Sequence, residues 1–274
     1  MRNRVLFAAL AVTVAAWSLG PALWQLLTAL KPDDQITRVP TVYWPQPVTW
    51  EHFRELWTRK PFARYLLNSA IIALASTALC VAVAAPAAAA LARMRQQQRD
   101  SWLLSFLVVS LFPPILLLFP LYEAVRGLGW INHPLALILP YAALHLPLAI
   151  WVLESGFRSV PTAIHDAARL DGLSTPARLL RVEAPLAAPA VATAGLLVFI
   201  FSWNEFMLAV TFLTRDRAKT VTAGIASIGG ASLYEIPWGP LCAAVVLATL
   251  PLFLLVLLFQ RRIVSGLTRG AVKG

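Results

Sequence analysis

Charged residues, cysteines and histidines are all scarce in this sequence. Charged side chains make up 13% of the 274 residues, whereas 59% are hydrophobic and the mean hydropathy is +0.70. A soluble core of this size could not bury so much apolar surface, so the composition indicates an integral membrane protein. The basic residues behind the net charge of +10 mostly flank apolar blocks, which argues against nucleic acid as a partner.

The sequence also lacks the patterns of catalytic and cofactor sites. Cys80 and Cys242 lie inside apolar blocks without ligand or redox spacing, so we expect them to pack. The histidines have no ligand partners at suitable spacing, which predicts no metal site. No Gly-x-x-x-x-Gly-Lys-Ser/Thr phosphate loop occurs, so we expect a non-enzymatic chain without a cofactor of its own. Any chemical energy would have to enter from another subunit.

What the sequence does contain is a series of apolar blocks long enough to cross a bilayer. The first, after Arg2 and Arg4, is too long for the apolar part of a signal peptide, so an uncleaved helix is expected. The sequence predicts an all-α membrane protein with six transmembrane helices in a single domain, 1–274, and both termini on one side. The blocks lie at 5–30, 65–91, 102–124, 135–153, 190–213 and 241–259.

Three blocks contain residues that bend helices or bring polar groups into the membrane. Pro113-Pro114 in the third block predicts a kink rather than a gate. A charge inside a span costs about 2.5–3.5 kcal/mol, so Glu205 in the fifth block should face a cavity, a partner or the interior. Contact with a translocated solute and hydrogen bonding between helices are the two alternatives for His145, Trp203, Asn204 and Glu205.

Lysine and arginine are modestly enriched in the short segments on one side of the predicted spans. That side holds both termini, the basic turn at 93–100 and a polar stretch at 159–189, and the positive-inside rule makes it cytoplasmic. The loops at 31–60 and 214–240 are then external. The first of them is rich in Trp and Pro and predicts a short helix near 49–57.

The polar stretch 159–189 has its own helix signals. Pro161 suits a first helical turn, Asp171-Gly172 ends that helix, and Pro176 fits the start of a second one. Pro185 then breaks the path into the fifth block. Two interpretations are open. The small residues in the first helix favour docking against another protein; the alternative is a helix pair that lies on lipid.

The same stretch resembles the EAA loop of bacterial ABC importer permeases, and more narrowly the MalG-like, MetI-fold branch that takes up carbohydrates. The family pattern is Glu-Ala-Ala, then Asp-Gly, then an aliphatic residue and proline; here Asp166 replaces Glu, and Ala184 stands where leucine is usual. The resemblance implies a coupling helix between spans four and five that docks on a separate ATPase. Its residues here are Pro161, Asp166, Ala167, Ala168, Asp171, Gly172 and Pro185.

The resemblance covers nearly the whole chain and implies a sugar importer of the bacterial cytoplasmic (inner) membrane with cytoplasmic termini. Its partners would be a second permease subunit, two ATPase subunits that carry ATP and Mg, an extracytoplasmic sugar-binding protein and membrane lipid. The expected core is 64–262, between a first helix with external loop at 1–63 and a cytoplasmic tail at 263–274.

Two expectations have explicit alternatives. The resemblance implies that the tail reaches the ATPase interface, whereas composition alone favours a disordered, headgroup-binding end. A disaccharide such as trehalose or maltose is the expected cargo, and the alternatives are a polyol, glycerol phosphate or polyamine permease, or a membrane scaffold that transports nothing. The tail residues are Gly270, Ala271, Val272, Lys273 and Gly274.

Overall fold

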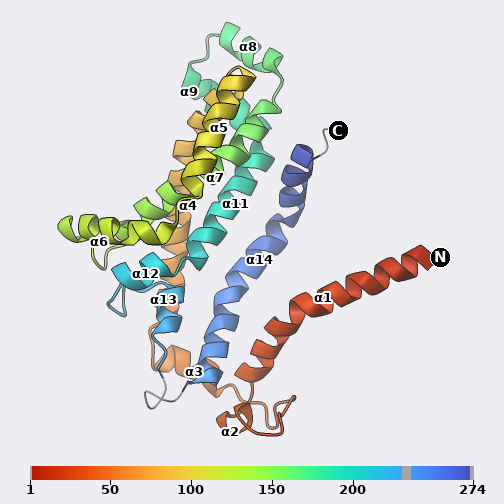
Figure 1. Ribbon diagram of the computed structural model, residues 1–274, viewed down its shortest axis with the longest axis vertical. Helices are drawn as coiled ribbons and strands as arrows, with labels where there is room; N and C mark the ends of the chain where they lie inside the picture. The colour runs from red at the N-terminus through yellow and green to blue at the C-terminus, as the bar shows by residue number, and fades with distance from the viewer. Residues whose placement is uncertain (1, 230–235, 272–274) are drawn as a thin grey trace.

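The computed structural model of the chain describes residues 2–229 and 236–271. In this part of the chain every regular element is a helix (Figure 1). Four helices are long and apolar enough to cross a membrane, and two bent pairs bring the candidate spans to six if each pair is one span. The predicted all-α membrane protein is confirmed. The four long helices are α1 (Arg2–Ala29), α4 (Phe62–Ala92), α7 (Leu135–Arg158) and α14 (Trp238–Ala271).

The other helices form the bent pairs and the connections. They are α2 (Asp33–Ile36), α3 (Glu51–Thr58), α5 (Gln96–Ser110), a 3₁₀ segment (Pro114–Leu117), α6 (Leu118–Gly127), α8 (Thr162–Leu170), α9 (Thr175–Arg178), a π-helical segment (Leu179–Glu183), α10 (Ala184–Leu186), α11 (Ala188–Asn204), α12 (Met207–Phe212) and α13 (Val221–Ala226). Helix α3 confirms the short helix expected near 49–57.

The centre of the molecule is a bundle of α4, α7 and α11. Helix α4 buries Cys80, Ala84 and Ala88 there, and small side chains of this kind let helix backbones approach closely. A Cβ built on Gly156 would lie 2.2 Å from Cβ of Ala190, so the α7–α11 contact requires glycine at this point. Both cysteines are free, as expected of packing residues.

The third predicted block is strongly bent. Helix α5 and the Pro114–Gly127 segment meet at 75°, and α6 extends sideways from the bundle, close to α12, in Figure 1. Pro113 and Pro114 cause the break, because proline lacks an N–H donor and its ring disfavours helix in the residue before it. The predicted kink is confirmed. Helix α5 starts earlier than expected, at Gln96, because its glutamines and arginine favour helix over the predicted turn.

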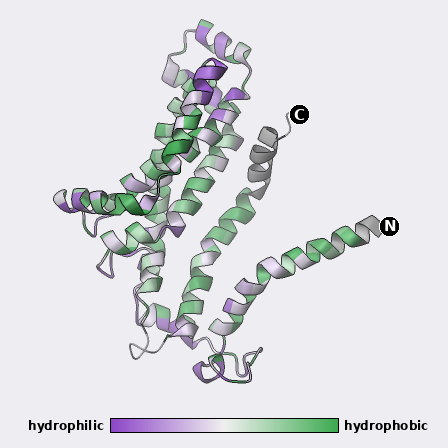
Figure 2. Cartoon of the chain, viewed as in Figure 1, coloured by the Kyte–Doolittle hydropathy of each residue, from purple (hydrophilic) through white to green (hydrophobic). Residues whose placement is uncertain are grey.

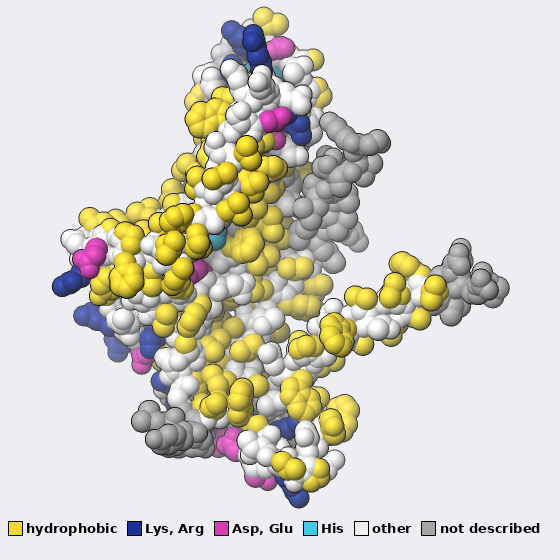
Figure 3. Space-filling model, viewed as in Figure 1, with side chains coloured by type: hydrophobic (Ala, Val, Ile, Leu, Met, Phe, Trp, Pro, Cys, Tyr) yellow, Lys and Arg dark blue, Asp and Glu magenta, His cyan; other side chains and the backbone are white. Residues whose placement is uncertain are grey.

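Helix α1 stands apart from the central bundle. It packs mainly on α14, and in Figure 1 the two helices diverge towards the N-terminus. An 18-residue apolar stretch of α1 has no buried residue within this chain, and Trp17 is 86% exposed; of the described side chains of α1, only Thr28 and Ala29, at the end of the helix, are buried. Figure 2 shows mostly hydrophobic residues along α1, and Figure 3 shows hydrophobic side chains over the middle of the molecule, with charged ones at its ends and at the left-hand side. Apolar surface of this extent needs lipid or another subunit to cover it.

Candidate functional site

The polar stretch forms a separate cap at one end of the bundle (Figure 1). Helix α8 ends at Leu170, and Gly172 takes a φ of +78°, the left-handed conformation predicted for it. The Gly172 N–H donates to the Arg169 carbonyl at 3.1 Å, and the Leu173 N–H donates to the Ala168 carbonyl at 3.2 Å. The predicted order of helix, corner and second helix is therefore present.

The far end of the cap turns sharply into the bundle. The Thr175–Leu186 segment meets α11 at 89°, and the corner lies at Ala187, between Pro185 and Pro189. The Ala187 N–H donates to the Glu183 carbonyl at 2.8 Å, which ties the corner to the π-helical segment. The cap thus leads from α7 directly into α11, two helices of the central bundle.

Most of the residues predicted for coupling lie on the surface of this cap. Ala168 is buried, and it is the member of the set that packs inward. Two apolar side chains on the same cap, Leu170 and Leu180, are 88% and 70% exposed although the cap lies at the polar end of the molecule (Figure 3). Such side chains suit a protein partner. The exposed predicted residues are Pro161, Asp166, Ala167, Asp171, Gly172 and Pro185.

Side chains that the sequence analysis did not single out hold the cap together. Arg93, at the end of α4, donates to the Val160 carbonyl at 3.3 Å. Arg178 donates to the Leu173 carbonyl at 3.3 Å and to Oγ1 of Thr175 at 3.2 Å, which closes the corner between α8 and α9. A further contact joins Nδ1 of His165 to Oε1 of Glu183. No spacing rule signals the two long-range contacts, Arg93 with Val160 and His165 with Glu183, in the sequence.

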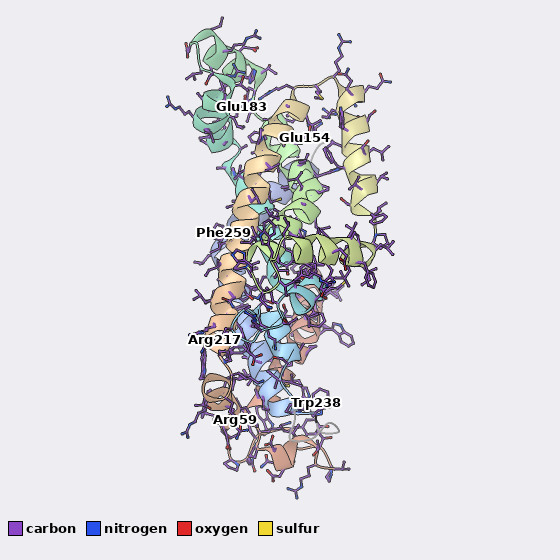
Figure 4. All side chains as sticks on the ribbon, turned by 90° about the vertical axis from the view of Figure 1, so that its left-hand side faces the viewer. Arg59, Glu154, Glu183, Arg217, Trp238 and Phe259 are labelled. Atoms are coloured by element: carbon purple, nitrogen blue, oxygen red, sulfur yellow. The ribbon has the colours of Figure 1, made fainter. Side chains whose placement is uncertain are left out.

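An ion cluster fixes α5 to α7 at the same end of the molecule. Glu154 is 3% exposed, and its Oε1 lies 3.6 Å from Nε of Arg99 and 3.5 Å from Nε of Arg158. Arg99 also contacts Asp100 at 2.9 Å. Figure 4 shows Glu154 and Glu183 near one end of the bundle, with Arg59 and Trp238 near the other.

Glu205 lies at a break in the fifth predicted block, where α11 ends and α12 begins. Its Oε1 accepts the Leu208 N–H at 2.8 Å, and its Oε2 accepts the Ala209 N–H at 3.2 Å and the Tyr141 hydroxyl at 2.5 Å. The Glu205 carbonyl accepts from Thr222 at 2.8 Å. The carboxylate therefore caps α12 and joins it to α7, which favours the structural alternative for this residue. The fifth block was predicted as one helix. The break between α11 and α12 is explained by the Glu205 carboxylate, which accepts the first N–H groups of α12.

The other three candidates from the spans each contact different partners. Trp203 is 4% exposed and donates to the Ala248 carbonyl of α14 at 3.3 Å. Asn204 is exposed and donates to its own helix, at the Ile200 carbonyl, over 2.8 Å. The His145 ring lies near those of Tyr141 and Phe201, with centroids 6.5 and 5.7 Å away.

The opposite end of the molecule contains an open hollow of about 560 Å³. Its lining includes Asp33, Lys60 and Trp238, together with the Glu55–Arg59 ion pair at 3.0 Å. This mixture of acidic, basic and aromatic groups suits polar contacts with a protein or a solute. Nearby, burial lowers the pKa of Lys31 from its usual value.

Across residues 2–229 and 236–271, no cluster of three or more His, Cys, Asp or Glu could hold a metal ion.

The predicted tail begins inside α14, whose backbone continues through Gly270 and Ala271. Val272, Lys273 and Gly274 lie outside the described residues.

Comparisons with known proteins identify a transport family. The family described as "Binding-protein-dependent transport system inner membrane component" matches residues 82–269. The chain is 37% identical to the trehalose transport system permease protein SugB of Mycobacterium tuberculosis, over 100% of this chain and 99% of the relative. It is 39% identical to the trehalose/maltose transport system permease protein MalG of Thermococcus litoralis, over 99% and 98%.

Two further comparisons concern another cargo and the fold. The chain is 39% identical to the sulfoquinovosyl glycerol transport system permease protein SmoH of Agrobacterium fabrum, over 93% of this chain and 89% of the relative. A crystal structure of a bacterial ABC transporter for import of the acidic polysaccharide alginate matches with a TM-score of 0.78 and 19% identity, over 94% of this chain and 95% of that chain. At this identity the structural match shows the fold alone.

Proposed function

The chain belongs to the binding-protein-dependent transport system inner membrane components, and we propose that it is the permease subunit of an ATP-driven sugar importer. The relatives that support this proposal are permeases named for trehalose, trehalose/maltose and sulfoquinovosyl glycerol transport. Trehalose or maltose is the proposed cargo. The proposed domain is the whole chain, 1–274, with its core at 64–262 and both termini in the cytoplasm.

The observation that carries the coupling role is the cap between α7 and α11. Its exposed leucines, Leu170 and Leu180, and the small exposed face of α8 suit insertion into a cleft on an ATPase subunit. Because the cap continues directly into two helices of the bundle, a push on α8 reaches the transmembrane region. Closure of the ATPase pair on ATP and Mg would repack these helices and switch access between the two sides.

The remaining partners are assigned to other surfaces. The uncovered apolar length of α1 fits a second permease subunit surrounded by lipid. The hollow lined by Asp33 and Trp238 lies at the end away from the cap, where an extracytoplasmic sugar-binding protein would dock. The tail residues Gly270 to Gly274 are proposed to reach the ATPase interface.

Reconstitution of the complete importer in liposomes tests this function. With ATP and Mg on the ATPase side and the binding protein on the other, labelled trehalose or maltose should accumulate and should stimulate ATP hydrolysis. Stimulation by glycerol phosphate or a polyamine instead would reassign the cargo. An assembled complex that hydrolyses ATP but moves no solute would favour the scaffold alternative.

A further inference from the structure

Two titratable residues inside the cap have no function in the coupling assignment above. Glu183 is 3% exposed and lies in the π-helical segment, whereas His165 comes from the surface helix α8. Their side chains meet through Nδ1 of His165 and Oε1 of Glu183, across 18 positions of sequence. Burying a carboxylate costs free energy unless it is paired, so the buried Glu183 side chain requires a partner such as His165.

The position of the contact in the cap gives it mechanical importance. The main-chain link between α8 and α9 runs through the Asp171-Gly172 corner, and a Cβ built on Gly172 would meet nothing within 4 Å. A single exposed corner of this kind does not by itself fix the angle between two helices. The contact of His165 with Glu183 ties α8 to the far side of the corner.

Glu183 also connects to the bundle through its main chain. Its carbonyl accepts the Ala187 N–H at 2.8 Å, and Ala187 is the residue at which the chain turns by 89° into α11. One residue therefore holds α8 by its side chain and the α11 corner by its backbone. The π-helical turn, a geometry often found at functional sites, places both groups of Glu183 in these positions.

We propose that His165 and Glu183 form a positioning pair that makes the cap move as one body, so that displacement of α8 by the ATPase is passed to α11. The proposal rests on the proposed function as a permease. It assigns the pair no contact with solute or nucleotide. Loss of the pair should leave ATP hydrolysis in place and reduce the solute moved per ATP.

The test is a double-mutant cycle in the reconstituted importer, with solute imported per ATP hydrolysed as the readout. His165→Ala and Glu183→Ala should each lower this ratio on the order of tenfold, and the double variant should lose no more than the worse single variant. Glu183→Gln, which keeps an acceptor oxygen, should recover most of the ratio. Arg181→Ala is the matched control, because it removes an exposed charge from the same π-helical segment.

If Glu183→Ala assembles poorly, the exchanged variant His165→Glu with Glu183→His provides a second test of the pair. It should restore the ratio above that of either single alanine variant. Equal ratios in wild type and His165→Ala, additive losses in the double variant, or an exchanged variant no better than the singles would each overturn the positioning pair. Absence of ATP-driven import by the wild-type complex would instead overturn the proposed function.

Discussion

Gly172 shows how one backbone conformation makes the turn between α8 and α9 possible. Its φ of +78° lies in the left-handed region, which costs other L-residues roughly 1–2 kcal/mol. Nothing lies within 4 Å of a Cβ built there, so the constraint comes from the backbone and not from crowding. Substitutions at this residue therefore separate conformational strain from steric contact.

We expect Gly172→Val to lower solute import and ATPase association, because a β-branched residue strongly disfavours this conformation. Gly172→Asn should retain most of both, since asparagine tolerates positive φ. Co-purification of the ATPase and uptake assays measure the two effects. Equal loss in both variants would mean that the partner requires a bare surface at this point rather than the turn itself.

Glu205 allows its two alternatives to be tested directly. Glu205→Ala removes the acceptor for two N–H groups and the Tyr141 hydroxyl, and should destabilise the protein by about 2–3 kcal/mol. Asn204→Ala is the neighbouring control, because it removes a hydrogen bond within one helix turn. Unfolding in detergent gives the stability. Unchanged stability with abolished uptake would favour a place for Glu205 on the solute pathway.

Sequence reasoning was most successful where a residue's effect is local. Gly172 and Pro113 act through their own backbone geometry, so the corner and the kink were predicted correctly. The contact between His165 and Glu183 depends on tertiary packing across the corner, and no local sequence pattern predicts it. Glu205 was recognised as exceptional, but its hydrogen-bond partners could not be read from the sequence, so its two alternatives stayed open.

At the scale of elements, α5 and α7 meet at a buried ion cluster. The side chains of Glu154 and Arg99 are 4% and 12% exposed, so their attraction is poorly screened by water. Helix boundaries at this end differ from the sequence expectation because the charged turn proposed for 93–100 lies partly inside α5. Hydropathy located the apolar blocks. It cannot show that a helix continues beyond a block into polar residues that favour helix.

Removing Glu154 should separate α5 from α7. We expect Glu154→Ala to destabilise the protein by about 3 kcal/mol, because Arg99 and Arg158 would lose the buried carboxylate they share and Arg99 would keep only Asp100. The control is Glu123→Ala, whose pair with Arg126 spans 4.0 Å between two largely exposed side chains and should change little. Thermal unfolding of the purified protein measures both. A similar melting temperature for wild type and Glu154→Ala would show that the cluster does not stabilise the bundle.

At the scale of the whole molecule, the chain leaves a large apolar surface uncovered. An 18-residue apolar stretch of α1 has no buried residue within the chain, whereas 44% of the corresponding stretch of α7 is buried. Composition predicted the membrane and the resemblance predicted a second permease subunit. Neither could say which surfaces stay uncovered, because that depends on how the helices pack in space.

The uncovered surface predicts partner-dependent stability. Assembly with the second permease subunit should raise the melting temperature, and a partner at 100 times its dissociation constant adds about 2.7 kcal/mol. Unfolding of this chain alone and in the assembled complex, in one detergent, gives the comparison. An identical melting temperature in both would show that lipid or detergent, not protein, covers α1.

The packing of α1 mainly on α14 has a consequence for how the protein is made. Among the described helices α1 is the first and α14 the last, so α1 is synthesised well before its main packing partner. During synthesis the α1 surface is held by lipid or by insertion factors alone. A chain cut short before α14 would lack the main packing partner of α1 within the chain.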